Sequence, residues 1–374
     1  MSSRPLPVLA LNCGSSSLKF GVYSTGAKGG SILSDLTNSD LGNQVNSIQE
    51  GEAEEIGHSG ATPDHATALR QTLESLEQGG LKEFSAVGHR LVHGGPHLRE
   101  HARLTAEVSQ KLQAAVEFAP LHLPAALAVI DAIEKKLPGI PQVICLDTAF
   151  HRHMPDVAKT LALPADVRAL GVERFGFHGL SLESILAQLH PVPHRLVVAH
   201  LGNGSSITAI RNGQSIDTSM GLTPTGGVMM GTRCGDLDPG AILYLMRHLP
   251  AGADKLQDLV DHKSGLLGIS SKASDVRELL AARASDPQAD LALRMFCYQV
   301  RKTVASMAAA LGGLDALVFT GGIGEHAHPV RDEICRGLAF LGPHTTQVLP
   351  AQEDLQIARI TSRLCPAEAA ACPA

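Results

Sequence analysis

The sequence predicts an α/β fold with two domains, and three observations support this prediction. Short apolar runs of strand length alternate with longer segments whose apolar residues recur at helical spacing. The chain of 374 residues is long enough for two domains of ordinary size. The segment LALNCGSS at residues 9–16 is echoed by AHLGNGSS at residues 199–206. Such internal similarity is typical of a duplicated fold, although Gly-Ser turns are common between strands and leave a chance likeness open.

The N-terminal part of the chain predicts a sheet covered by helices. Residues 7–12 form an apolar run that ends at a Gly-Ser-Ser turn, and residues 18–23 alternate like the returning strand of a hairpin. Residues 24–80 are rich in Gly, Ser, Thr and Asn and indicate little beyond one helix. The other elements predicted here are helices at about 66–78, 105–118 and 124–137 and strands at 86–92 and 143–146.

The C-terminal part predicts a second set of strands and helices. Residues 195–210 are rich in strand formers, and Asn212-Gly213 joins them to a strand at 214–218. An Asn-Gly pair favours a tight hairpin because both turn positions need φ > 0. The remaining predicted elements are helices at 238–247, 253–260, 274–282, 288–311 and 330–340 and a strand at 316–320 that leads into a glycine turn.

The composition excludes several classes of protein. Hydrophobic residues make up 44% of the chain and charged residues 18%, which rules out a disordered chain. The formal net charge of −6 argues against a nucleic-acid binder, which would carry a basic excess. The seven cysteines are scattered without a C-x-x-C pair, and no apolar run approaches the ~20 residues that cross a bilayer. Because no signal peptide is recognisable, we expect a reduced, cytoplasmic protein without nucleic-acid or membrane partners.

Four turns made of small residues are candidate phosphate sites. Turns of this kind let backbone N–H groups approach an anion closely. None of them has the P-loop pattern G-x-x-x-x-G-K-S/T, and no G-x-G-x-x-G opens a helix. A phosphate site would therefore depend on several turns together. The four turns are Asn12 to Ser17, which closes with the cation of Lys19, then Leu201 to Ser205, Gly226-Gly227 and Gly321 to Glu325.

Four charged or polar residues stand out by position. Arg90 lies near a strand end and Arg233 lies between glycines, contexts suited to binding phosphoryl oxygens; a structural arginine bonded to carbonyls or a carboxylate is equally open. Asp147 ends a buried strand, where ligands of α/β proteins bind, or else caps the next helix. His178, framed by Phe and Gly, is either structural or functional. Two histidine pairs lack a third metal ligand and are interpreted as surface residues, namely His151 with His153 and His326 with His328.

The chain resembles the acetate and propionate kinase family from Val8 almost to its end. Ten segments carry this resemblance in order, and together they are highly specific. They are NCGSSSLKF (12–20), HRLVHGG (89–95), APLH (119–122), DTAFH (147–151), RFGFHG (174–179), HLGNGSSI (200–207), DTSMGLTP (217–224), MMGTRCGDLDP (229–239), KSGLLGIS (263–270) and GGIGEH (321–326).

The resemblance implies two ribonuclease H-like domains of the actin-like ATPase type, with mixed β-sheets flanked by helices and a cleft between them. The expected boundaries are residues 1–148 for the first domain and 149–357 for the nucleotide-binding second domain. A C-terminal segment at about 358–374 would return to the first domain. The family is dimeric, so the resemblance also implies a homodimer.

The resemblance further implies reversible transfer of the γ-phosphoryl group of ATP to acetate, which gives acetyl phosphate and ADP. Arg90 and Arg233 would hold the phosphoryl group and the carboxylate, and His178 would hydrogen-bond the transferring group. Asp147 would be catalytic. Asn12 and Glu353 would position Mg2+ or Mn2+. The residues implied for ATP are Lys19, His200, Leu201, Gly202, Asn203, Gly204, Asp275, Val276, Arg277, Gly322, Ile323, Gly324 and Glu325. Those implied for the substrate pocket are Arg90, Val92, Leu121, Phe177 and Pro224.

The chemistry of this reaction suits the candidate residues. A carboxylate substrate is already ionised at pH 7, so its oxygen attacks phosphorus without a general base. The site must align the reactants and relieve the repulsion between two anions. Arginines, a histidine and a magnesium ion meet this need. We therefore expect Asp147 to orient a cation rather than to accept a proton.

Some positions depart from the family pattern, and they leave the choice between acetate and propionate open. They are Leu123 in place of Asn, Leu180 and Leu182 in G-T-S-H, Thr225-Gly226 in place of Leu-Glu, and His326 in place of Asn. Two rival interpretations belong to other classes. One is a serine acyl-enzyme, since residues 16–19 satisfy S-x-x-K, although that motif should open a helix. The other is a non-catalytic ATP-binding module of the actin-like fold.

Overall fold

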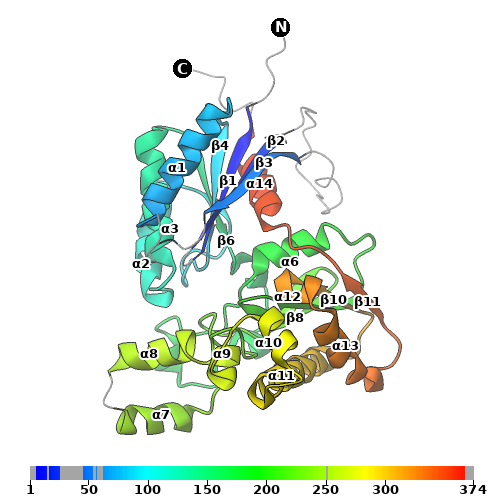
Figure 1. Ribbon diagram of the computed structural model, residues 1–374. Helices are drawn as coiled ribbons and strands as arrows, with labels where there is room; N and C mark the ends of the chain where they lie inside the picture. Colours follow the sequence, from blue (N-terminus) through cyan, green and yellow to red (C-terminus); the bar gives the residue numbers. More distant parts are fainter. Residues whose placement is uncertain are drawn as a thin grey trace. The chain divides into compact units, whose positions relative to one another are not determined.

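The computed structural model describes residues 6–14, 17–25, 45–53, 56, 62–249 and 252–366, and these divide into two compact units (Figure 1). Unit 1 contains Met1–Arg152, Gly179–His190 and Gln352–Ala374, and unit 2 contains His153–His178 and Pro191–Ala351. The expected boundaries were at 148/149 and 357/358, and residues 179–190 were expected in the second domain. Ser15 and Ser16 of the first turn, and the cysteine at position 372, lie outside the described residues.

The sheet of unit 1 has the strand order β3-β2-β1-β4-β6-β5. Its first three strands form an antiparallel meander, and β4 and β6 run parallel to β1 on the other side. Parallel strands bring their carboxyl ends to one edge of a sheet. At this edge Asn12 of β1 pairs with Arg90 of β4, and Asp147 follows β6. The strands are β1 (Val8–Cys13), β2 (Leu18–Thr25), β3 (Val45–Ala53), β4 (Ala86–Leu91), β5 (Ala102–Arg103) and β6 (Gln142–Leu146).

Helices cover both faces of this sheet, so its central strands are apolar on both sides. Leu9 and Leu11 pack into one core with α1 (His65–Gln78), α2 (Ala106–Ala115) and α3 (Leu123–Lys136). Val8 and Ala10 point to the opposite face and pack with α14 (Glu353–Leu364), drawn in red in Figure 1. The alternation follows from the period of two in a strand.

The segment around α6 (Gly179–Leu186) packs in unit 1 because of its apolar residues. Leu180 is fully buried in the core that contains Val143 and Ile357. The sequence placed this segment in the second domain. The two hydrophobic replacements in the G-T-S-H pattern, Leu180 and Leu182, are both buried, which is the physical reason for the difference.

The sheet of unit 2 repeats the topology of the first, with the order β11-β10-β7-β8-β9. An antiparallel meander is again followed by two parallel strands beside its first strand. The repeated Gly-Ser-Ser segments join equivalent strands, β1 to β2 and β7 to β8, so the predicted duplication is confirmed. The strands are β7 (Arg195–Leu201), β8 (Ser205–Arg211), β9 (Gln214–Thr218), β10 (Ala316–Thr320) and β11 (Thr345–Val348).

A long helix, α11 (Pro287–Leu311), forms the core of unit 2 with β7 and β8. Asp286 caps its start by accepting hydrogen bonds from the N–H groups of Gln288 and Ala289. Gly312 ends it with a left-handed φ of 71°. The other helices are α4 (Asp156–Lys159), α5 (Ala165–Arg168), α7 (Pro239–His248), α8 (Ala253–His262), α9 (Gly265–Ser270), α10 (Val276–Ala282), α12 (Gly321–His326) and α13 (His328–Arg336).

Two expectations need correction. The glycine turn at residues 321–325 is the helix α12, which begins directly after β10. His151 is buried rather than on the surface, because it lies in the short helix η3 (Ala149–His151) beneath the end of β6. Lys19 lies on strand β2, so the helix that an S-x-x-K acyl-enzyme requires does not form there. The Asn212-Gly213 turn is confirmed, with φ of 51° and 77°.

Within the part of the chain that the structure describes, no helix is both long enough and apolar enough to cross a bilayer.

Candidate active site

The carboxyl edge of the first sheet carries a buried ion pair. Arg90 donates to Oδ2 of Asp147 from Nη2 at 2.7 Å and from Nε at 3.1 Å. Asp147 is 1% exposed and the side chain of Arg90 is 17% exposed. The short helix after Asp147 has Thr148 as its N-terminal residue, without a side-chain cap. Asp147 therefore does not cap this helix, and its side chain pairs with Arg90 instead.

Asn12 extends this pair into a network that reaches the C-terminal helix. Its Oδ1 accepts from Nη1 of Arg90 at 3.0 Å. Its Nδ2 donates to Oε2 of Glu353 at 3.1 Å and to Oδ1 of Asp354 at 3.0 Å. The orientation of the Asn12 amide is fixed at both ends, because an arginine can only donate and a carboxylate accepts. The structure therefore brings together Asn12, Arg90, Asp147 and Glu353, as the sequence predicted, and adds Asp354.

Burial and charge act in opposite directions on this network. Burial raises the pKa of Asp147, while the guanidinium of Arg90 opposes that shift. Burial would lower the pKa of Arg90, but Asp147 and Glu353 outweigh it and raise the pKa, so the guanidinium stays charged. Burial also raises the pKa of Asp354, with the amide of Asn12 acting against it. Oδ1 of Asp147 is buried and has no hydrogen-bond partner among the described residues.

A second layer behind Asp147 was not predicted. Nδ1 of His101 accepts from the backbone N–H of Leu146 at 3.0 Å, and Nε2 bonds Glu183 at 3.1 Å. Gln356 donates to the other oxygen of Glu183 at 2.9 Å. Burial would raise the pKa of Glu183, but His101 and Gln356 lower it. No sequence signal singles out His101, because its partners lie on β6 and α6, far from it in the chain.

In unit 2, His178 is held in an unusual backbone conformation. Its φ is +59°, a left-handed value that is rare for a residue with a side chain. Nδ1 lies 2.9 Å from Oγ of Ser206, and the ring stacks on His200 with centroids 4.1 Å apart. Strained backbone of this kind persists where surrounding contacts impose it, and such positions cluster at functional sites.

Arg233 and His178 converge on the glycine of the turn between β7 and β8. A Cβ atom built on Gly204 would lie 3.2 Å from both Nη1 of Arg233 and Nε2 of His178. A Cβ on Gly231 would lie 2.5 Å from Oδ1 of Asn203. Only glycine at these two positions leaves the side chains where they are. Unit 2 therefore brings together His178, Arg233 and the turn 202–204, all predicted from the sequence.

The predicted nucleoside residues lie around two helix starts. Gly322 is on α12, and its backbone nitrogen lies 3.9 Å from the Cβ position of Gly202, beside the turn. Asp275 caps α10 by accepting from the N–H of Arg277 at 2.7 Å and pairs with its guanidinium. Arg277 is exposed, whereas the side chain of Val276 is buried in the core, so only the backbone of Val276 is available to a ligand.

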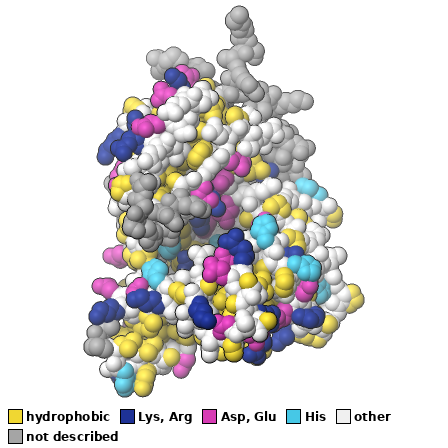
Figure 2. All heavy atoms as spheres, in the orientation of Figure 1, with side chains coloured by type: hydrophobic (Ala, Val, Ile, Leu, Met, Phe, Trp, Pro, Cys, Tyr) yellow, Lys and Arg dark blue, Asp and Glu magenta, His cyan; other side chains and the backbone are white. Residues whose placement is uncertain are grey.

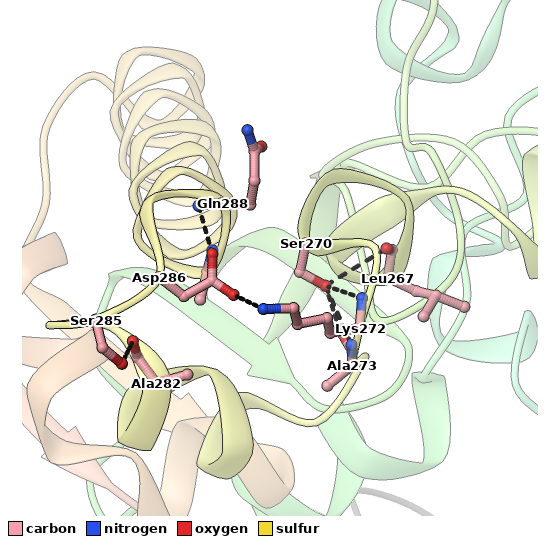
Figure 3. Close-up of polar contacts among 9 residues, drawn as sticks. Leu267, Ser270, Lys272, Ala273, Ala282, Ser285, Asp286 and Gln288 are labelled. Carbon is pink, nitrogen blue, oxygen red and sulfur yellow. Dashed lines mark hydrogen bonds and ion pairs between the residues drawn. The ribbon is translucent and has the colours of Figure 1, made fainter.

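The loop before α10 is fixed by Ser270, as Figure 3 shows. Its hydroxyl donates to the carbonyl of Ala273 at 2.8 Å and accepts from the N–H groups of Lys272 and Ala273. Lys272 reaches Asp286 at 2.6 Å, and Asp286 caps α11. This ion pair and the adjacent N–H groups lower the pKa of Asp286. The contacts tie the loop to the long core helix and thereby position Asp275.

Two residues expected to contact ATP make other bonds. Oε1 of Glu325 accepts from the backbone N–H groups of Gly321 and Ala351, both at 3.0 Å. Glu325 therefore joins the start of α12 to the segment that leads into α14. Lys19 pairs with Glu52 at 3.4 Å on neighbouring strands.

The expected pocket residues differ in exposure. Val92 and Phe177 are buried at 7% and 1% exposure, while Leu121 is 42% exposed. The carbonyl of Pro224 accepts from Nη1 of Arg233 at 3.4 Å. Val92 and Leu121 belong to unit 1, and Phe177 and Pro224 belong to unit 2.

Comparisons with known proteins show the family to which the chain belongs. The model of the acetokinase family matches residues 7–361. A curated acetate kinase from Rhodopseudomonas palustris is 40% identical over 394 residues, which cover 96% of this chain and 98% of the relative. One from Dichelobacter nodosus is 41% identical over 391 residues, with coverage of 96% and 98%.

Solved structures show the same fold. A propionate kinase from Francisella tularensis has a TM-score of 0.83 at 34% identity and is matched over 96% of this chain and 100% of its own. An acetate kinase from Porphyromonas gingivalis has a TM-score of 0.81 at 35% identity, with coverage of 96% and 99%. The chain therefore belongs to the acetokinase family, whose curated members are enzymes that use a carboxyl group as phosphoryl acceptor.

Proposed function

We propose that this chain reversibly transfers the γ-phosphoryl group of ATP to acetate, with acetyl phosphate and ADP as products. The observation that supports this best is the convergence of Arg233 and His178 on Gly204. This places a cation and an imidazole beside a turn whose backbone N–H groups suit phosphate oxygens. The buried pair of Arg90 and Asp147 supplies a second fixed cation.

The proposed mechanism needs no general base. Acetate is ionised at neutral pH, and its oxygen attacks the γ-phosphorus in line with the leaving ADP oxygen. The main barrier is the repulsion between two anions. Arg90 and Arg233 would reduce it by holding the phosphoryl group and the carboxylate, and His178 by hydrogen-bonding the transferring group. Bonds to Asp147 and Asn12 use three of the five N–H groups of Arg90 within the described residues, which leaves two for anion oxygens.

Asp147 would act by orienting Arg90. Both bonds from the guanidinium go to Oδ2, so the carboxylate fixes the plane of the cation. A guanidinium held in one orientation loses little entropy when it binds an anion. Asp147 therefore has no need to accept a proton during the reaction.

The residues at the start of α14 suit a magnesium ion. Mg2+ prefers oxygen ligands and usually binds through one or two carboxylates together with substrate phosphates. Glu353 and Asp354 supply carboxylate oxygens beside the amide of Asn12, and the buried Oδ1 of Asp147 is without a partner among the described residues. We propose that Asn12 and Glu353 hold Mg2+ or Mn2+. The ion would neutralise charge on the phosphates of ATP.

Propionate or another short-chain acid is the alternative acceptor. The solved propionate kinase from Francisella tularensis is as similar in structure as the acetate kinases. Leu121 and Pro224 are partly exposed, whereas Val92 and Phe177 are buried. An apolar pocket discriminates only modestly between two substrates that differ by one methylene, as acetate and propionate do. Steady-state kinetics with formate, acetate, propionate and butyrate would rank the acceptors.

A trapping experiment tests the proposed reaction. The protein is mixed with ATP, Mg2+, acetate and hydroxylamine, which converts an acyl phosphate into a hydroxamate. We expect hydroxamate that depends on both ATP and acetate. A reaction without ATP and the Arg233→Ala variant serve as controls. No hydroxamate from any of the four acids would refute the proposal, as would hydroxamate formation without ATP.

We also propose that the chain is a cytoplasmic homodimer. Helix α7 has no buried residue, and Leu243, Tyr244 and Met246 on it are more than half exposed, at 51%, 59% and 54%. Figure 2 shows yellow side chains gathered at the lower left, where α7 lies in Figure 1. Apolar patches of this kind mark interaction surfaces. Six cysteines among the described residues are free thiols, which suits a reducing compartment.

A further inference from the structure

The loop that carries Arg233 is attached to the C-terminal end of helix α8 (Ala253–His262). The N–H of Cys234 donates to the carbonyl of Val260 at 2.9 Å, and the N–H of Ser264 donates to the carbonyl of Thr232 at 2.9 Å. A Cβ built on Gly265 would lie 2.2 Å from the carbonyl oxygen of Met230. The loop backbone thus lies directly against the residues that follow α8, and a small movement of either would move the other.

One residue of α8, Asp261, bonds the loop on both sides of Arg233. Its carboxylate accepts a hydrogen bond from the hydroxyl of Thr225. Its backbone carbonyl accepts from the hydroxyl of Thr232 at 2.7 Å. Asp261 is 8% exposed, so these bonds form away from bulk water, where losing a partner is costly.

These two threonines adjoin the groups that hold the guanidinium. Thr232 directly precedes Arg233, so the bond from Thr232 to Asp261 positions the backbone of Arg233. Thr225 follows Pro224, whose carbonyl accepts from Nη1 of Arg233 at 3.4 Å. The side chain of Arg233 is therefore fixed at its backbone and at its tip through one carboxylate and one carbonyl of the same residue.

We propose that Asp261 and Thr225 are positioning residues that set the guanidinium of Arg233 for the carboxylate acceptor. This inference rests on the proposed function, because the proposed function is what requires Arg233 to be placed accurately. Misplacing a binding group by a fraction of an ångström costs much of its contribution. We call the two bonds that Asp261 accepts, from Thr225 and from Thr232, the Asp261 clamp. Thr225 is one of the positions where this chain departs from the family pattern, so the clamp is a property of this sequence.

The test uses matched variants of the full chain. Thr225→Val removes the hydroxyl at nearly constant shape, and Thr225→Ser restores it. Asp261→Ala removes the carboxylate, and Asp261→Asn keeps an oxygen that accepts the bond from Thr225. Steady-state kinetics give KM for acetate, KM for ATP and kcat, and urea unfolding reports whether each variant is folded.

We expect Thr225→Val and Asp261→Ala to raise KM for acetate about 5–10-fold and to leave KM for ATP within about twofold, the scale of one positioning hydrogen bond. Thr225→Ser and Asp261→Asn should restore most of the loss. The double variant Thr225→Val/Asp261→Ala should be no worse than the single variants, because both remove the same bond.

Three results would overturn the inference, namely an unchanged KM for acetate in folded Thr225→Val, an equal rise in KM for ATP, or additive losses in the double variant. The Arg233→Ala variant separates this inference from the proposed function. If Arg233→Ala keeps full activity, the proposed role of Arg233 is wrong and the clamp has no purpose. If Arg233→Ala is impaired while Thr225→Val behaves like the unchanged protein, only the clamp is wrong.

Discussion

Asp147 binds Arg90 through a single oxygen, Oδ2, which accepts from both Nη2 and Nε of the guanidinium. The second oxygen, Oδ1, is buried with no partner among the described residues. The pair is therefore not the symmetric two-oxygen arrangement that purely structural arginine–carboxylate pairs often adopt. One oxygen orients the cation, and the other is left without a hydrogen bond among the described residues.

The Arg90–Asp147 pair gives the first prediction. Arg90→Ala should lower kcat by about 100-fold or more, the scale of losing a charge-stabilising group, and Arg233→Ala should do the same. Arg90→Lys should recover little, because an ammonium lacks the planar fork of donors with which Arg90 bonds both Asp147 and Asn12. Kinetics and far-UV circular dichroism check the result. Full activity in the two alanine variants would contradict the assigned roles.

Gly179 gives the second prediction. A Cβ atom at this position would lie 2.3 Å from the carbonyl oxygen of Asp147, whose partner is the N–H of Gly179 at 2.9 Å. Gly179→Ala must therefore displace the end of β6, and we expect kcat to fall by about tenfold or more and the protein to lose stability. Gly252→Ala is a matched control, because Gly252 has nothing within 4 Å of its Cβ position and, like Gly179, has no positive φ. Equal activity of the two variants would refute this prediction.

The burial of His89 should make the free energy of unfolding depend on pH. The residue is buried, which lowers its pKa to about 4, while Gln142 opposes the shift. Between that value and the ordinary value near 6.5 the unfolded chain binds more protons, so stability falls as the pH falls through this window. The loss should be about 2 kcal/mol between pH 7.5 and pH 5.

Urea unfolding at the two pH values, with His89→Gln as the comparison, measures this contribution. Glutamine keeps a donor for Gln142 but does not titrate, so the variant should lose less stability on acidification than the unchanged protein. The same loss in both proteins would show that His89 is not responsible.

Replacing Glu325 by Gln and replacing it by Ala should affect activity and stability differently. Its single oxygen Oε1 accepts from the N–H groups of Gly321 and Ala351. Glu325→Gln keeps an accepting oxygen and should retain most activity. Glu325→Ala leaves the N–H groups of Gly321 and Ala351 without their acceptor and should reduce the free energy of unfolding by about 1–3 kcal/mol. It should also raise the Mg2+ concentration needed for half-maximal rate, because Ala351 leads into Glu353. If Glu325→Gln is as defective as the alanine variant, Glu325 acts through its charge instead.

Helix α7 predicts how the oligomeric state changes. Replacing Leu243 and Tyr244 by Asp should convert the proposed homodimer into a monomer, because the charges would have to be desolvated at the interface. Sedimentation velocity or light scattering measures the mass. The exposed pair Arg247 and His248 on the same helix, replaced by Ser, provides a control that keeps the apolar side chains. Dimers that survive the Asp replacements would place the interface elsewhere.

The sequence predicted the central strands of both sheets well, because their signals are local. Residues 316–320 were predicted as a strand and are one, and the long helix at 288–311 is offset by a single residue. Gly321 to Glu325 was mistaken for a turn because three glycines suggest one, but the N–H of Gly321 is bonded by Glu325 one helical turn later. A side-chain bond of this kind leaves no signature in composition.

The candidate site was predicted where motifs are contiguous and missed where the fold brings distant segments together. Arg90, Asp147, His178 and Arg233 each lie in a recognisable segment. His101 and Glu183 lie in segments without such a signal, and they meet only because α6 packs on the first sheet beside α14. Asp261 was missed because its partners, Thr225 and Thr232, are far from it in the chain.

Helix α14 has a consequence for synthesis of the protein. Among the helices that the structure describes it comes last along the chain, yet it covers the face of the first sheet that carries Val8, Ala10 and Val143. Until α14 emerges, the nascent chain exposes this apolar surface, and Asn12 lacks its partners Glu353 and Asp354. Chaperones that bind extended apolar segments would therefore find a target in any nascent chain that stops short of α14, and the network around Asn12 could form only after α14 has been synthesised.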